Sequence, residues 1–270
     1  MRACFLAPAV AAGLLSLSAC YIDDFAGPRI SRDFHYSYPL SPKGSLSVEG
    51  FNGSIEISGW DQDTVDVSGT KYARSEQAVD ALQVRVDHSA NAVSIRTDRP
   101  SVGHGNEGVR FVIKAPRGAV LDRIASSNGA IRIQDGGGPT RLKTSNGAIH
   151  IVGWKGSVEA NTSNGAIEAD LDSAQGPIRF ETSNGSVQLR LPSKMDDDVR
   201  VHTSNGSITV RAPDDLNARV TARTSNAKIT SDLELRTRGE VGPHHLEGVL
   251  GAGGPLLDLS TSNGSIRITR

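Results

Sequence analysis

Apolar and polar residues alternate with a period of two through most of this 270-residue chain. From Gly44 onward the alternating runs are short, as in SLSVE at 45–49, IEIS at 55–58 and TVDV at 64–67. Strict alternation predicts half-buried β-strands with their apolar residues on one face. Only the segment SEQAVDALQ, which begins at Ser75, has the spacing of a short helix. The pattern therefore predicts an all-β fold with one short helix.

A nearly constant turn recurs along the second half of the chain. Ser-Asn pairs begin at positions 127, 145, 163, 183, 204, 225 and 262, at intervals of 18, 18, 20, 21, 21 and 37 residues. Glycine follows every pair except the sixth, which is followed by Ala227. Alternating apolar residues precede and follow each turn. Self-similarity at a nearly fixed period is typical of repeat architectures.

Two arrangements of the repeats fit this pattern. Asn-Gly is the favoured two-residue β-hairpin loop, and pairing across Asn164 and Gly165 keeps the apolar faces matched, which would give an antiparallel β-meander. In a β-solenoid, a single-stranded parallel β-helix, equivalent residues instead stack about 4.8 Å apart. The uniform Thr-Ser-Asn favours the solenoid, because hairpins do not need the same residues in every repeat.

We predict a right-handed β-solenoid with turns of 18–21 residues. Carrying the period of two through each turn places the threonine and the asparagine inside, so the asparagines should form an inward ladder of stacked amides. Each amide hydrogen bond contributes roughly 1 kcal/mol, and an unpaired buried amide costs roughly 1–3 kcal/mol. The predicted ladder consists of Asn128, Asn146, Asn164, Asn184, Asn205, Asn226 and Asn263.

The N-terminus has the form of a lipoprotein signal. Arg2 precedes an apolar stretch, and small residues precede Cys20. The closing LSAC resembles the bacterial lipobox, in which cleavage leaves a lipid-modified cysteine, carrying acyl chains such as palmitate, as the first residue. Cys4 would leave with the signal, and lipidation explains the single remaining thiol of an exported chain. The residue after the cysteine is Tyr21 and not aspartate. By resemblance to bacterial lipoproteins, this indicates that the protein is located in the outer membrane.

Four segments are expected along the chain. Residues 1–19 are a signal peptide, and 20–43, with three prolines, read as a tether. Residues 44–124 form an irregular N-terminal β part, and 125–270 form the solenoid, interrupted by an insertion at about 231–256.

Charge and candidate ligands limit the possible chemistry. The net charge is −1 with both signs interspersed, so nothing predicts a nucleic-acid partner. Asp196, Asp197 and Asp198 share one turn and could offer oxygen ligands to Ca²⁺, but successive side chains diverge in extended backbone, so a solvated turn is expected. His244 and His245 lie in the insertion without fixed further ligands for zinc, which indicates a mobile loop. No cofactor or metal is predicted.

The order of motifs resembles the bacterial putative-adhesin family, a domain-of-unknown-function family of β-strand-repeat envelope proteins. The resemblance rests on the lipobox, GSIEISGWD at 53–61, RFVIKAPRGAVLD at 110–122, the tandem TSNGAI turns and the closing LEGVLGAGGPLLDLSTSNGSIRI. It implies a β-helical fold, export and an adhesin-like role, and it supplies no catalytic residues. The chain departs from the family pattern at Ala227 and in the 37-residue interval. Because alanine tolerates positive φ worse than glycine, irregular stacking is expected there.

These observations favour a non-catalytic envelope protein anchored in the membrane through lipidated Cys20. Its solenoid would act as an adhesin-like stalk or interaction surface for an envelope protein, a surface protein or a glycan. One alternative is a polysaccharide lyase or hydrolase, whose carboxylates must converge on one groove; the outward Glu159, Glu168 and Glu181 are the candidates. A second alternative is an envelope-stress accessory protein that binds another protein through a sheet face or the solenoid end.

Overall fold

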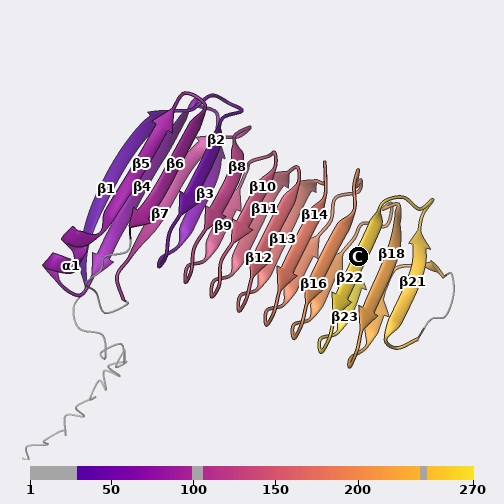
Figure 1. Ribbon diagram of the computed structural model, residues 1–270. Coiled ribbons are helices and arrows are strands. Elements are labelled where there is room, and N and C mark those ends of the chain that lie inside the picture. The colour runs from indigo at the N-terminus through magenta and orange to yellow at the C-terminus, as the bar shows by residue number, and fades with distance from the viewer. Residues whose placement is uncertain (1–28, 99–105, 238–241) are drawn as a thin grey trace, which may run out of the picture.

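Residues 29–98, 106–237 and 242–270 are described by a computed structural model, and they form two long sheets that face each other (Figure 1). The predicted signal peptide and Cys20 lie outside the described residues. The one helix within them is α1 (Glu76–Ala81), which begins where the Ser75 side chain accepts a hydrogen bond from the Ala78 backbone N–H. In this part of the chain no helix is long and apolar enough to cross a membrane.

Sheet A has eleven strands in the spatial order β1-β4-β7-β3-β9-β11-β13-β15-β17-β23-β19. Their bounds are β1 (Ile30–Pro39), β3 (Ile55–Trp60), β4 (Thr64–Ala73), β7 (Gly108–Pro116), β9 (Ile131–Gln134), β11 (Ile149–Lys155), β13 (Ile167–Ser173), β15 (Val187–Arg190), β17 (Ile208–Arg211), β19 (Ile229–Ser231) and β23 (Ile266–Thr269).

Sheet B has twelve strands in the order β20-β21-β18-β22-β16-β14-β12-β10-β8-β2-β6-β5. Their bounds are β2 (Ser45–Glu49), β5 (Gln83–Ser89), β6 (Ala92–Asp98), β8 (Val120–Ala125), β10 (Thr140–Lys143), β12 (Val158–Thr162), β14 (Ile178–Thr182), β16 (Val199–Thr203), β18 (Ala218–Thr224), β20 (Arg236–Thr237), β21 (His245–Leu250) and β22 (Leu256–Thr261).

Each repeat is one coil of a solenoid. The Ser-Asn turn joins a strand of sheet B to a strand of sheet A, and we call such a pair of strands with its turn a rung. Strands pair with their counterparts in the next rung, in parallel: β12 pairs with β10 and β14, and β13 pairs with β11 and β15. The solenoid prediction is confirmed, and the antiparallel meander is excluded because the two strands that flank a turn lie in different sheets.

The core is a narrow aliphatic layer between the two sheets. Equivalent positions stack from rung to rung, as in the register Ile149↔Ile167↔Val187, and all three side chains are fully buried. Burial of one such side chain contributes roughly 1.5–3 kcal/mol. Phe111 and Phe180 are the largest side chains that are fully buried in the described residues. A layer this thin explains how a chain with 4% aromatic residues forms a continuous core.

The rungs do not stack in the order of the sequence at the C-terminal end. β22 and β23, the last rung along the chain, lie between the rung of β16 and β17 and the rung of β18 and β19. The chain therefore forms the outermost rung, β18 and β19, before the rung beneath it, β22 and β23. The 37-residue interval provides the length needed for this return.

Two segments expected to lack regular structure contain strands. The predicted tether at 20–43 includes β1, which pairs antiparallel with β4; the prolines on either side hid the period-two spacing of Phe34, Tyr36 and Tyr38. The predicted insertion at 231–256 includes β20 and β21, and β21 pairs antiparallel with β18. The expectation of a mobile loop at His244 and His245 is therefore wrong, because the free edge of β18 provides a pairing partner.

Candidate functional site

The seven predicted asparagines form a continuous column of side-chain hydrogen bonds. Each Nδ2 donates to the Oδ1 of the asparagine on the rung below, at 2.6–2.8 Å. The column begins at Asn52, which accepts from Asn128 at 2.6 Å. At the far end its order is Asn205, Asn263, Asn226, since the last rung in sequence is inserted. The column thus links every rung from β2–β3 to β18–β19.

The asparagine column is on the outside of the molecule, so the predicted inward orientation is wrong. All seven side chains are exposed. The period of two ends at the repeat threonine because the chain turns there, and the serine and asparagine that follow project to solvent. Each asparagine bond is therefore formed in competition with water, and its net contribution is modest.

The inward ladder is made by the repeat threonines. Thr144, Thr162, Thr182, Thr203, Thr224 and Thr261 are buried, and each Oγ1 donates to the glycine carbonyl oxygen of the rung below at 2.9–3.0 Å. In four rungs the same hydroxyl also accepts from the glycine N–H of its own turn at 3.1–3.2 Å. One hydroxyl thus satisfies a buried donor and a buried acceptor. Serine would keep these hydrogen bonds but lose the packing of the methyl group, and valine would keep the packing but lose the hydrogen bonds.

The repeat glycines are required by stacking and not by a positive φ. Among the described turn glycines only Gly53, in the β2–β3 rung, has a positive φ, at 106°. The reason for expecting irregular stacking at Ala227 is therefore not met. A Cβ on Gly165 would lie 1.8 Å from the carbonyl oxygen of Gly147 on the rung below. Ala227 lies on the last rung of the stack, where β19 is the edge strand of sheet A. There, His244 Nδ1 bonds the Ala227 carbonyl oxygen at 2.6 Å and takes the place of the next threonine.

Replacing Asn184 by alanine is expected to lower the free energy of unfolding by only about 1 kcal/mol, although it removes two hydrogen bonds, because both are exposed. The lost bonds are those to Asn164 and from Asn205, each 2.8 Å. Urea unfolding followed by circular dichroism measures the change. Asn161→Ala, on the outer side of β12, is the matched control and should stay within about 0.5 kcal/mol of wild type. A loss of more than about 3 kcal/mol for Asn184→Ala would show that the outer column dominates stability.

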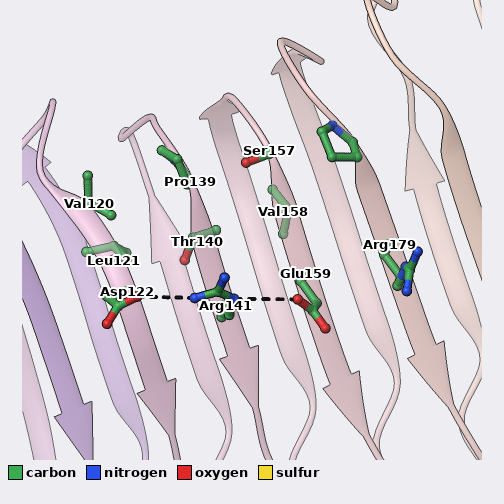
Figure 2. Close-up of a pocket in the computed structure, with 11 residues that line it drawn as sticks. Val120, Leu121, Asp122, Pro139, Thr140, Arg141, Ser157, Val158, Glu159 and Arg179 are labelled. Atoms are coloured by element: carbon green, nitrogen blue, oxygen red, sulfur yellow. Dashed lines mark hydrogen bonds and ion pairs between the residues drawn. The ribbon is translucent and has the colours of Figure 1, made fainter.

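The outer face of sheet B carries a row of charged side chains at the rung spacing. Figure 2 shows Asp122, Arg141 and Glu159 on adjacent strands, with Arg141 bonded to Asp122 at 3.2 Å and to Glu159 at 3.7 Å. Arg179 continues the row on β14, where it is in register with Glu159. These residues, with Pro139 and Ser157, line a shallow hollow. Exposed ion pairs of this kind contribute about 0–1 kcal/mol each, so the row offers a surface for recognition more than a source of stability.

The outer face of sheet A also carries charged pairs between neighbouring strands, together with the exposed Val112 and Val152. His150 lies 3.1 Å from Glu168 in the neighbouring strand, and Arg190 forms an ion pair with Asp170. The hydrogen bond to Asp170, together with its charge, raises the pKa of Arg190 above the ordinary value.

The structure does not bring together the three carboxylates considered for an enzyme. Glu159 and Glu181 lie on the outer side of sheet B, on β12 and β14, whereas Glu168 lies on β13 of sheet A, on the opposite face. Period-two reasoning identified all three as outward residues but could not assign them to a sheet. A site that uses these three residues in one groove is excluded.

The other candidate ligands have separate partners. Asp196 pairs with Lys194 at 2.9 Å, and Asp198 pairs with Arg200 at 3.3 Å and accepts from the Leu256 backbone N–H at 2.9 Å. His245 lies 3.3 Å from Glu247. Within 29–98, 106–237 and 242–270, no group of three or more metal-binding side chains converges.

Residues 123–211 match the family model described as Toastrack, DUF4097. This stretch runs from β8 to the end of β17, so the family resemblance inferred from the sequence is confirmed over the regular rungs. Among solved structures, the chain resembles a protein described as a putative lipid binding protein from Parabacteroides distasonis (14% identity, 88% of this chain and 97% of that chain, TM-score 0.45). It also resembles a putative adhesin from Bacteroides fragilis (14%, 88% and 97%, TM-score 0.37) and a putative cell adhesion protein from Clostridium sporogenes (12%, 88% and 99%, TM-score 0.35). No curated protein is significantly similar to the chain.

Proposed function

We propose that this protein is a non-catalytic cell-envelope lipoprotein of the outer membrane whose solenoid is a rigid, adhesin-like interaction surface. The observation that carries the proposal is the continuous stack of rungs, which runs from the edge strands β1 and β5 at one end to β19, β20 and β21 at the other (Figure 1). Eleven strands of sheet A at a spacing of about 4.8 Å extend for roughly 50 Å. A stack attached at one end would carry its outer faces away from the anchor.

Rigidity and surface chemistry support this role. The buried threonine bonds and the outer asparagine column connect each rung to the next, so the stack resists bending. Its outer faces present charged and polar side chains in straight rows, such as Asp122, Arg141 and Glu159. Rows of mixed sign fit an extended partner with polar and charged groups, such as a surface protein or a glycan, through electrostatic complementarity.

Replacement of Cys20 by alanine is expected to release the protein from membranes, because the acyl chains supply the hydrophobic attachment. Cell fractionation followed by immunoblotting measures the distribution. Cys4→Ala, within the predicted signal, is the matched control and should leave the protein in the membrane fraction. Membrane retention of the Cys20→Ala protein would contradict the anchor.

The adhesin-like part of the proposal has its own test. A strain that lacks the protein should adhere less to glycan-coated or cell surfaces, and the wild-type gene should restore adherence where the Cys20→Ala variant does not. Unchanged adherence in the deletion strain, across a panel of surfaces, would contradict this part of the proposal while leaving the anchor intact.

A further inference from the structure

The N-terminal end of the stack exposes an apolar strip. Here the sheets end in the edge strands β1 and β5, which lie at the same end of the molecule (Figure 1). β1 contributes Phe34, Tyr36 and Tyr38 to the strip, and β5 contributes Val84 and Val86. The structure leaves Tyr36 36% exposed, and the other four side chains are partly buried against the core. We call these five residues the end strip.

Contacts between the rings hold the end strip in a defined arrangement. The Tyr36 ring centroid lies 5.4 Å from that of Phe34 and 6.3 Å from that of Tyr38. Phe34 packs edge-on against the core residue Phe111 at 6.0 Å, and Tyr38 lies 4.5 Å from His88 of β5. The strip therefore bridges the two sheets and is anchored to the core, so it is a built surface and not a set of loose side chains.

The chemistry of the end strip suits the boundary between water and lipid. Tyrosine combines an apolar ring with a polar hydroxyl and is enriched at membrane interfaces. All four tyrosines of the chain, at 21, 36, 38 and 72, precede residue 73. The arginines beside the strip are neutralised, Arg32 by Asp80 at 3.1 Å and Arg85 by Asp98 at 2.6 Å. Contact with lipid would thus depend on the rings and little on anionic headgroups.

The length of the tether brings the end strip to the membrane. Because β1 begins at Ile30, only nine residues, 21–29, separate Cys20 from β1. A fully extended chain of this length spans roughly 30 Å. With Cys20 acylated, the anchor also keeps the strip at a high effective concentration near lipid, so a weak contact is sufficient.

We propose that the end strip rests on the phospholipid interface of the membrane in which Cys20 is anchored, so that the solenoid stands with its axis directed away from the bilayer. This inference relies on the lipid anchor of the proposed function. It adds which surface of the protein contacts lipid, and it leaves both sheet faces free for partners.

The test places a fluorescent label on the lipidated protein reconstituted into vesicles of phosphatidylethanolamine and phosphatidylglycerol that contain a headgroup nitroxide lipid. Tyr36→Cys and Ser37→Cys carry the label at the end of the stack, and Ser37→Cys guards against disturbance of the strip. Gln188→Cys, on β15 and roughly 35 Å along the stack, is the control. Quenching at 36 and 37 should exceed quenching at 188 by about threefold or more.

The outcomes separate the two proposals. Vesicle association with equal or greater quenching at 188 overturns the inference, since the solenoid would then lie flat or extend away without contact. Loss of quenching together with end-to-end crosslinking through Ser37→Cys also overturns it and identifies a second copy as the occupant. Absence of acyl mass on Cys20 and of vesicle association overturns the proposed anchor and, with it, this inference.

Discussion

Alanine in place of Gly165 is expected to lower the free energy of unfolding by about 3–5 kcal/mol, among the largest effects of any single methyl group in this chain. The added Cβ would lie 1.8 Å from the carbonyl oxygen and 2.4 Å from the carbonyl carbon of Gly147. Both atoms belong to the backbone of the rung below, which parallel pairing on each side holds in place. The clash can be relieved only by separating two rungs, which breaks the threonine and asparagine bonds between them. Urea unfolding followed by circular dichroism measures the loss.

The matched control is Gly242→Ala, because a Cβ at Gly242 meets no atom within 4 Å. That variant should unfold within about 0.5 kcal/mol of wild type. If Gly165→Ala were equally stable, the rungs would have to be more widely spaced than the parallel register implies, and the steric reason for the repeated glycine would be wrong.

Thr182→Val is expected to lower the free energy of unfolding by about 2–4 kcal/mol, although threonine and valine side chains have nearly the same shape. The hydroxyl accepts from the Gly185 N–H at 3.2 Å and donates to the Gly165 carbonyl oxygen at 3.0 Å. Valine leaves both buried backbone groups without their partner, and each unsatisfied group costs about 1–3 kcal/mol. The same unfolding experiment measures the change.

Two further variants isolate the hydroxyl. Thr182→Ser keeps the hydroxyl and should recover most of the stability, with a loss of about 1 kcal/mol for the missing methyl group. Thr209→Val, on the outer side of β17, should be nearly neutral, within about 0.5 kcal/mol. A neutral Thr182→Val would assign the repeated threonine to packing alone and refute the inner ladder.

The asparagine and threonine columns show what the repeated turn and the period of two can and cannot predict about side-chain orientation. The recurrence of Thr-Ser-Asn-Gly predicted that equivalent residues stack, and the period of two correctly placed the threonines inside. The same reasoning placed the asparagines inside, although all seven are exposed. Alternation describes extended backbone, and it stops being valid at the residue where the chain turns.

The sequence predicted less about which residues lie together on one surface. The outward position of Glu159, Glu168 and Glu181 followed from alternation, but their division between two sheets did not, because alternation within a strand is the same in both. The end strip was hidden for a different reason. Its residues lie in a segment with prolines on both sides, and only the edge of β4 shows that this segment pairs.

The amino-acid sequence by itself determined that the chain coils into stacked rungs with a thin aliphatic core, because a repeated period of two and a repeated turn are local properties that every copy shares. Tertiary structure alone decided which rung lies next to which at the C-terminal end, how β1, β5 and β21 cover the ends of the stack, and which side chains share a face. These choices depend on free strand edges far apart along the chain. A strand pairs with whichever edge remains open, and the sequence of that strand does not record which edge that is.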